Sequence, residues 1–128
     1  MVLDSSALVA IILREPGHER VAEKMAAARE LSAGAPTLVE TALVLGGKTR
    51  SDATAPLARL VDGLDVSVIA FGRRHFDEAA RAWLAFGKGR HPAALNFGDC
   101  MTYAIAKVSG EPLLALGDDF ARTDLILA

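Results

Sequence analysis

The sequence predicts an α/β fold: a single domain spanning residues 1–128, in which helices cover both faces of a short parallel β-sheet to form a three-layer sandwich. Two observations predict this fold. Short, strongly apolar segments alternate with amphipathic segments of about ten residues or more, which is typical of β-α-β units and therefore of parallel strands. A chain of 128 residues, 52% of them hydrophobic, has the length of one domain and enough apolar residues for a buried core.

The first third of the chain predicts two strands and two helices. Residues 1–3 are apolar and form a buried strand that ends at Asp4. Residues 5–13 form a helix that stops at the Arg-Glu-Pro-Gly segment 14–17. Residues 18–29 form a second helix, because apolar and charged residues fall on opposite faces, and residues 31–32 form a second strand.

The middle and last thirds repeat this alternation. A third helix opens with Pro36 and ends at Gly46-Gly47, and residues 51–62 carry leucines at helical spacing. Residues 65–69 are β-branched and predict a strand, and residues 73–86 predict a long amphipathic helix followed by a basic loop over 87–92. A helix over 96–108, a strand over 113–116 and a short edge strand over 125–127 complete the fold.

Composition excludes several classes of protein. The longest aliphatic run has seven residues, far short of the ~20 that cross a bilayer, so no membrane association is expected. The first residues carry no basic segment of a signal peptide, and a single cysteine favours a reducing cytoplasm. The three histidines and Cys100 show no zinc-binding spacing. With a net charge of −2, any contact to nucleic acid must come from a local patch.

Acidic residues stand where helices begin after strands or loops. Asp4 follows the first strand, Glu40 and Asp99 each lie one turn into a helix, and Asp118 and Asp119 follow the strand over 113–116. Parallel strands deliver their carboxyl ends to one edge of a sheet, so these acids are expected to converge. A cluster of carboxylates repels itself unless a cation compensates it, and hard oxygen ligands suit Mg²⁺ or Mn²⁺. The pattern therefore predicts metal-assisted hydrolysis of a phosphodiester.

Helix capping is the alternative interpretation of the same positions. Thr37 and Glu40 have the spacing of a capping box, Asn96 and Asp99 have a similar spacing, and Asp4 has the place of an N-cap residue. Capping explains each acid singly, and it leaves unexplained why apolar segments at both ends of the chain end in acids.

Four segments in order along the chain resemble one family. They are MVLDSSAL at residues 1–8, TLVETALV at 37–44, GKGRH at 87–91 with LNFGDC at 95–100, and LLALGDDF at 113–120 with TDL at 123–125. The chain resembles the PIN-domain nucleases, and more narrowly the VapC toxins of prokaryotic VapBC toxin–antitoxin pairs. The resemblance covers nearly the whole chain and implies a small α/β PIN fold that hydrolyses RNA with Mg²⁺ or Mn²⁺.

The resemblance also implies residue roles. Asp4 and Asp99 are expected to be direct metal ligands, and Glu40 is expected to complete the pocket through a water on the metal or as a proton acceptor. Asp119 is favoured as the fourth acid, with Asp118 retained, because Leu116-Gly117 replace the hydroxyl-bearing pattern usual in the family. Ser6 lies where the family often has a polar residue near the metal, and its hydroxyl is expected to orient a phosphate or water.

Basic and apolar surfaces suggest partners. Lys88, Arg90 and His91 lie on a glycine-rich loop before the Asp99 helix and are candidate contacts to RNA, with an ordinary solvated loop as the alternative. Trp83, Phe86 and Tyr103 are interpreted as core or interface residues, and Cys100 as a buried apolar residue.

The helices around residues 8–12 and 38–45 are apolar on several sides. Deep burial explains this pattern; a homodimer contact together with a site for a VapB-like antitoxin explains it equally, as the resemblance suggests.

The function predicted from these features is a cytoplasmic, prokaryotic, metal-dependent endoribonuclease toxin. A phosphotransfer receiver and an Asp-x-Asp phosphatase fit less well, because Asp4 is followed by Ser5-Ser6 and no lysine follows residue 107. A catalytically silent PIN fold that binds RNA or protein is the remaining alternative, and only an assay separates it from the nuclease.

Overall fold

The computed structural model describes all 128 residues and has four parallel strands and six helices. The elements in chain order are β1 (Val2–Leu3), α1 (Ser5–Leu13), α2 (His18–Ala27), β2 (Ser32–Gly34), α3 (Ala35–Thr49), α4 (Thr54–Gly63), β3 (Ser67–Ile69), α5 (Arg73–Phe86), α6 (Phe97–Ser109) and β4 (Leu113–Leu114). The α/β prediction is therefore confirmed. None of the helices is long and apolar enough to cross a membrane.

The strands lie in the order β3-β2-β1-β4, so the first and last strands are neighbours. Val2 pairs with Leu113 and Leu3 with Leu114, both in parallel register. The expected strand over 125–127 is reduced to a single parallel bridge between Leu113 and Leu127. This order places the residues that follow β1 and β4 at the same edge of the sheet.

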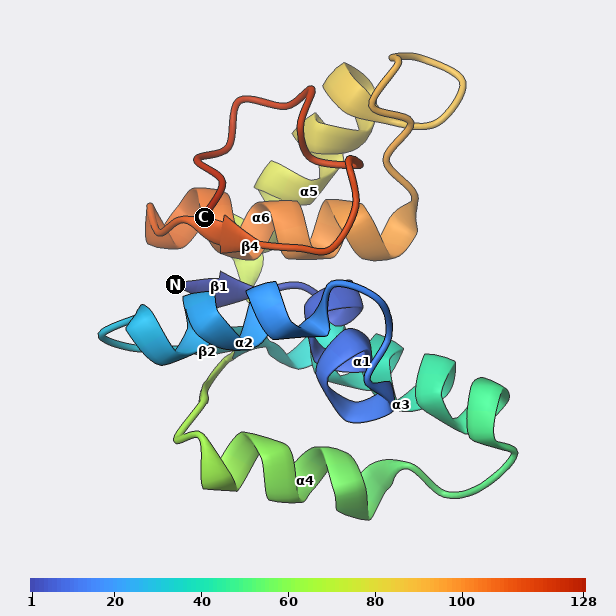
Figure 1. Cartoon of the computed structure of the whole chain (residues 1–128). Coiled ribbons are helices and arrows are strands. Elements are labelled where there is room, and N and C mark those ends of the chain that lie inside the picture. Colours follow the sequence, from blue (N-terminus) through green and yellow to red (C-terminus); the bar gives the residue numbers. More distant parts are fainter.

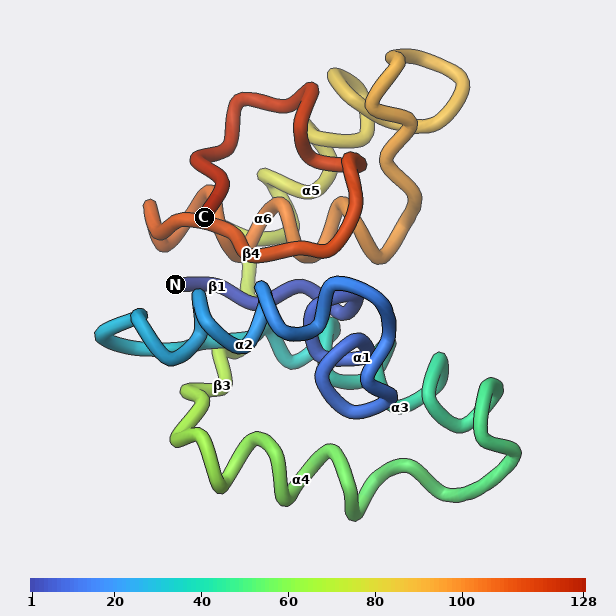
Figure 2. The backbone as a smooth tube through the Cα atoms, in the orientation of Figure 1, coloured from blue at the N-terminus to red at the C-terminus, as the bar shows by residue number.

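Helices cover both faces of the sheet, as Figures 1 and 2 show with α5 and α6 above it and α1 and α2 below it. Val2 and Leu113 are buried in the cluster that includes residues of α5 and α6, whereas Leu3 and Leu114 are buried in the cluster formed with α1 and α2. This alternation follows from the two-residue period of a strand. Because both faces are covered, every residue of these two strands is buried and apolar.

The third helix is longer than the sequence predicts. The expected end at Gly46-Gly47 is wrong, because α3 continues to Thr49 and ends where Arg50 adopts a left-handed conformation (φ 53°). Each glycine in a helix interior costs about 1 kcal/mol relative to alanine. Complete burial of Leu45 against Val9 and Ala53 offsets that cost, since burying one leucine contributes roughly 1.5–3 kcal/mol.

Candidate active site

Asp4 lies at the carboxyl end of the central strand β1. Its backbone N–H donates to Leu114 O (2.9 Å), and its side chain is only 5% exposed. The carboxylate is the N-cap of α1, where Oδ2 accepts hydrogen bonds from the backbone N–H (3.0 Å) and the hydroxyl (2.6 Å) of Ser6. The capping interpretation of Asp4 is therefore correct, and it accounts for only one of the two carboxylate oxygens.

Ser6 connects this carboxylate to the strand beside it. While its hydroxyl donates to Asp4, the same oxygen accepts the backbone N–H of Leu116 (2.9 Å), just beyond β4. The single hydroxyl proton is thus directed to Asp4. Ser6 holds the Asp4 carboxylate in place here, rather than presenting its proton to a phosphate or water as the sequence suggested.

Glu40 is half-buried in α3 and does not cap that helix. The helix begins at Ala35 with Gly34 as its N-cap, so the capping box expected between Thr37 and Glu40 is absent. Thr37 is instead buried and its hydroxyl hydrogen-bonds to the Thr102 hydroxyl of α6 (3.0 Å). Capping, the alternative explanation for an acid at position 40, is therefore wrong.

The Glu40 carboxylate lies directly against the first turn of α6. A Cβ atom placed on Gly98 would lie 2.6 Å from Glu40 Oε2, much closer than van der Waals contact. Only a glycine leaves room for the carboxylate at this point. The residue before Asp99 is thus part of the site because it lacks a side chain.

Asp99 both caps α6 and belongs to the acidic group. Its Oδ2 accepts the backbone N–H of Asn96 (2.7 Å), while Asn96 Oδ1 accepts the backbone N–H of Asp99 (2.9 Å), which is a reciprocal capping box. These bonds use only Oδ2 of Asp99. Capping is therefore correct for this position and leaves Oδ1 for another partner.

The acids from four segments act on one another electrostatically. Burial raises the pKa of Glu40, and the negative charges of Asp4 and Asp99 raise it further, while a hydrogen bond from Ser5 opposes them. Burial also raises the pKa of Asp99, where the Asn96 backbone hydrogen bond acts in the opposite sense and the charges of Asp4 and Asp119 add to the rise. The structure thus brings together Asp4, Glu40, Asp99 and Asp119.

The two adjacent aspartates differ in their effect on this group. Its charge contributes to the raised pKa of Asp99, whereas Asp118 does not contribute to the shifts of Glu40 or Asp99. Both side chains are exposed, and the buried Phe120 anchors the segment that carries them.

The donor set of this site fits a hard divalent cation. No basic side chain forms an ion pair with any of the four acids. No three His, Cys, Asp or Glu side chains lie close enough to complete a ligand set by themselves. Mg²⁺ and Mn²⁺ accept such sets, because they keep several waters and bind through one or two carboxylates. Asp4 and Asp99 each keep one carboxylate oxygen that no capping hydrogen bond uses, so these two residues could hold such an ion.

The candidate RNA-binding loop lies between α5 and α6 and is closed by a bridge between Gly87 and Leu95. Lys88 and Arg90 are exposed. His91 is half-buried: its ring packs edge-on against Phe86 (5.3 Å between centroids), and its Nδ1 accepts the backbone N–H of Ala93 (3.1 Å). His91 therefore stabilises the loop, whereas Lys88 and Arg90 are free to contact a ligand.

A groove beside the acids was missed by sequence reasoning. We call it the aromatic groove; it has a volume of about 540 Å³ and is lined mainly by apolar side chains of α5 and α6. Its principal residues are Phe71, Phe76, Trp83, Lys88, Phe97 and Met101. Trp83 is 40% exposed and is not part of the core, whereas Tyr103 and Cys100 are buried as expected. The available signal was the spacing of Phe76, Ala79, Ala80 and Trp83, which forms an apolar stripe along one helix face.

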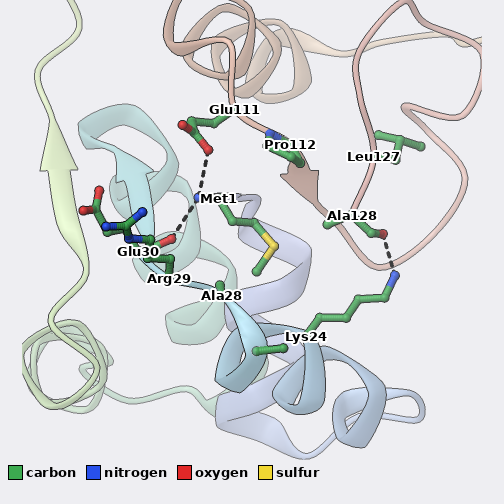
Figure 3. A pocket seen from close by; sticks show the side chains of 10 residues that line it. Met1, Lys24, Ala28, Arg29, Glu30, Glu111, Pro112, Leu127 and Ala128 are labelled. Atoms are coloured by element: carbon green, nitrogen blue, oxygen red, sulfur yellow. Dashed lines mark hydrogen bonds and ion pairs between the residues drawn. The ribbon is translucent and has the colours of Figure 1, made fainter.

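A second cavity, of about 580 Å³, lies at the opposite, amino-terminal edge of the sheet (Figure 3). Several of the charged groups around it are bonded within the chain. The α-amine of Met1 donates to Glu30 O (2.9 Å) and contacts Glu111 (3.5 Å), and Lys24 Nζ donates to Ala128 O (2.5 Å). This cavity therefore differs from the acidic edge, where no basic side chain pairs with the acids.

Comparison with known proteins identifies the family. The family model for the PIN domain matches residues 1–126. The chain is 44% identical to ribonuclease VapC36 of Mycobacterium tuberculosis over 126 residues, covering 98% of this chain and 91% of that protein. It is 38% identical to ribonuclease VapC30 of the same species over 125 residues, covering 98% and 95% of the two chains.

Solved structures agree on the fold. The crystal structure of Mycobacterium tuberculosis VapC20, described as a Sarcin-Ricin loop cleaving toxin, matches with a TM-score of 0.80 at 18% identity over 99% of this chain and 97% of that one. A toxin–antitoxin complex from Klebsiella pneumoniae matches with a TM-score of 0.72 at 14% identity, over 99% and 95% of the two chains. A fold with helices on both faces of a parallel sheet, acids gathered at its carboxyl edge, and relatives of this identity along nearly the whole chain together lead to one conclusion: the protein belongs to the PIN-domain family, among the VapC ribonucleases.

Proposed function

We propose that this chain is the Mg²⁺- or Mn²⁺-dependent endoribonuclease toxin of a toxin–antitoxin pair, with Asp4, Glu40, Asp99 and Asp119 forming its active site. The observation that carries the proposal is electrostatic. Burial, together with the charges of neighbouring acids from separate segments, raises the pKa of Glu40 and Asp99, while no basic side chain pairs with them. Such an arrangement destabilises the protein alone and becomes favourable when a cation binds, which is typical of a functional site.

Each residue has a role that its contacts support. Asp4 and Asp99 hold the ion, with Ser6 and Asn96 fixing their carboxylates through hydrogen bonds. A divalent cation bound there supplies Lewis acidity and neutralises the charge that develops on the phosphodiester. The raised pKa of Glu40 makes its carboxylate a stronger base, suited to accept the proton of the attacking water as a P–O bond forms and the leaving ribose oxygen departs. Asp119, which is exposed, is the fourth acid of the site.

The RNA backbone requires positive charge next to this acidic pocket. Lys88 and Arg90 are exposed on the loop that leads to Asn96 and the Asp99 helix, and they are the cations we assign to phosphate contacts. His91 supports the shape of this loop through its contacts to Phe86 and Ala93.

A VapB-like antitoxin and a second copy of the chain are the proposed protein partners. Two of the matching structures are complexes of VapBC pairs from Rickettsia felis and Salmonella typhimurium. In this chain, α3 exposes Val39 (61%) and Leu43 (72%) beside Glu40, an apolar surface suited to a protein contact. Size-exclusion chromatography with light scattering tests the homodimer, and a strict monomer at micromolar concentration would contradict it.

The experiment that tests the nuclease is cleavage of total RNA by purified, antitoxin-free protein with Mg²⁺ or Mn²⁺. Asp99→Asn is the matched variant, because asparagine can still accept the Asn96 N–H of the capping box. We expect metal-dependent fragments from the wild type alone. Equal cleavage by both proteins would indicate a contaminant or a misplaced site. Absence of cleavage by folded, metal-replete wild type would favour a PIN fold that binds RNA or protein without cutting it.

A further inference from the structure

The aromatic groove adjoins the acidic site through the first turn of α6. Asn96, Phe97 and Cys100 line the groove, and the Asp99 carboxylate of the acidic group lies next to Asn96, because its Oδ2 accepts the backbone N–H of that residue (2.7 Å). A strand of RNA whose phosphodiester lies at Asp99 therefore has this groove within reach of its neighbouring nucleotide. The volume of about 540 Å³ falls in the range of pockets that hold small organic ligands.

The chemistry of the lining points to an aromatic ligand attached to an anion. Phe97 is 78% exposed and Phe76 57% exposed, so both rings are largely accessible to solvent. Lys88 is the one charged side chain that lines the groove, and the Arg73 guanidinium lies 5.8 Å from the centre of the Phe76 ring. Aromatic faces next to cations match a nucleobase with its phosphate, because bases stack on rings while cations contact the backbone.

We propose that the aromatic groove binds an unstacked nucleobase adjacent to the phosphodiester that is cut, with Phe97 and Trp83 as its stacking surfaces and Lys88 as the contact to its phosphate. This inference rests on the proposed ribonuclease function and deepens it. It makes Phe97 and Trp83 binding residues for single-stranded RNA, a state in which bases are free to leave their stacks.

Trp83 provides a local readout, because it is the only tryptophan of the chain. The probe is a random-sequence pool of 12-nucleotide RNA, titrated with Mg²⁺ into the Asp99→Asn variant so that the RNA is not consumed. Inorganic polyphosphate serves as an anion without bases. We expect saturable quenching of Trp83 fluorescence by RNA and none by polyphosphate. Binding of RNA without any change at Trp83 would overturn the proposal.

Phe97→Leu in the same background tests the stacking surface, because leucine keeps the apolar contact and removes the ring. Its exposure makes misfolding an unimportant concern, and the melting temperature verifies this. We expect the RNA affinity to fall by roughly 5- to 150-fold. Ile126→Ala, which alters another exposed apolar side chain (65%) beside the start of β4, is the control and should leave the affinity unchanged.

The remaining outcomes separate this proposal from the proposed function. If the wild type cleaves RNA and Asp99→Asn does not, while Phe97→Leu binds RNA as tightly as its parent, the groove proposal fails and the nuclease stands. If Phe97→Leu instead converts a dimer to a monomer with RNA affinity retained, the groove is a protein contact and the proposal is wrong. If the wild type neither binds nor cleaves RNA with Mg²⁺ or Mn²⁺, both proposals fail.

Discussion

The charged groups at the two edges of the parallel sheet differ in whether they have bonding partners. At the amino-terminal edge, the Met1 amine contacts Glu30 and Glu111, and Lys24 reaches the Ala128 carbonyl. At the carboxyl edge, the four acids have no basic partner, and their mutual repulsion contributes to the raised pKa of Glu40 and Asp99. Both edges border on cavities or grooves, so concavity alone does not distinguish them.

The bonded charges at the amino-terminal edge contribute to the stability of the fold. The unpaired acids at the carboxyl edge do not, and they suit the binding of a cation. Exposed ion pairs contribute little, typically 0–1 kcal/mol, and their loss affects stability only slightly. Unpaired, partly buried acids oppose folding until a cation arrives. The charge pattern therefore distinguishes the two edges, whereas cavity volume does not.

The largest expected effect is the difference in cleavage rate between two variants, each of which neutralises one acid at one edge of the sheet. Asp4→Asn should lower the metal-dependent RNA cleavage rate by roughly 100-fold or more, because charge stabilisation by a bound ion is worth several kcal/mol. Glu111→Gln at the amino edge should leave the rate within twofold. Initial rates on one RNA substrate at saturating metal compare the two variants. Similar losses in both would show that the two edges do not differ in function.

A smaller effect is expected from adding one methyl group inside the acidic edge. Gly98→Ala places a Cβ 2.6 Å from Glu40 Oε2, so that carboxylate must move. We expect a 10- to 100-fold loss of activity, since a displacement of about 1 Å can have that cost. Gly47→Ala, where nothing lies within 4 Å of the added atom, is the control and should retain full activity. An active Gly98→Ala protein would remove Glu40 from the mechanism.

Ser6→Ala tests whether the orientation of Asp4 matters. The hydroxyl donates to Asp4 and accepts from Leu116, and loss of such a supporting hydrogen bond typically weakens metal binding about 10-fold or more. Calorimetric titration with Mn²⁺ measures this change directly. Ser109→Ala, whose hydroxyl bonds only to carbonyls of its own helix, should bind the ion normally. Unchanged affinity in Ser6→Ala would make the Ser6 contact purely structural.

The smallest effect is on stability and depends on pH. Burial and the charge of Asp4 raise the pKa of Glu40 above its ordinary value of 4.5, so the folded state holds that proton more tightly than the unfolded state does. The contribution of Glu40 is therefore most favourable below pH 4.5 and is lost as pH rises through the folded pKa. At pH 7 without divalent ions, Glu40→Gln should melt a few degrees higher than the wild type.

The same measurement with the ion present sharpens the contrast. Adding Mg²⁺ should raise the melting temperature of the wild type, because an ion that binds only the folded state stabilises it. Asp99→Asn should gain much less, and a substitution at the amino edge such as Glu111→Gln should gain as much as the wild type. Equal gains in all three proteins would place the ion away from the acidic edge.

Much of the fold follows from local patterns in the sequence. Helix positions were predicted to within a few residues because the apolar periodicity of α2, α5 and α6 is strong, and because Asp4 and the segment 14–17 bound α1. The end of α3 was not predicted, since Leu45 packs with Val9, which is distant in sequence, and with Ala53 beyond the helix end. This packing outweighs the two glycines. The strand expected over 113–116 shortens to Leu113–Leu114 because the Leu116 N–H turns to the Ser6 hydroxyl instead of a neighbouring strand.

The candidate site was likewise predicted only in part from the sequence. Its acids were found because their segments match a family pattern, and their convergence follows from neighbouring parallel strands. Sequence could not decide between capping and catalysis, since Asp99 does cap its helix while Glu40 does not. The exposure of Phe97 and Trp83 depends on how α5 packs against α6, which periodicity within one helix does not specify.

The hydrogen bond between the Thr37 and Thr102 hydroxyls joins α3, which carries Glu40, to α6, which carries Asp99. The distance between these two acids therefore depends on how the two helices pack at this point. Glu40 lies one turn after Thr37, and Asp99 lies one turn before Thr102, so each acid is carried by the helix that this bond fixes. Insertions and substitutions in the surface loops would then leave the separation of the carboxylates intact. Exchange of either threonine for valine, which keeps the shape and removes the bond, would alter it. In a lineage that changed its preferred ion, we expect the substitutions at this threonine pair, with the acids themselves retained.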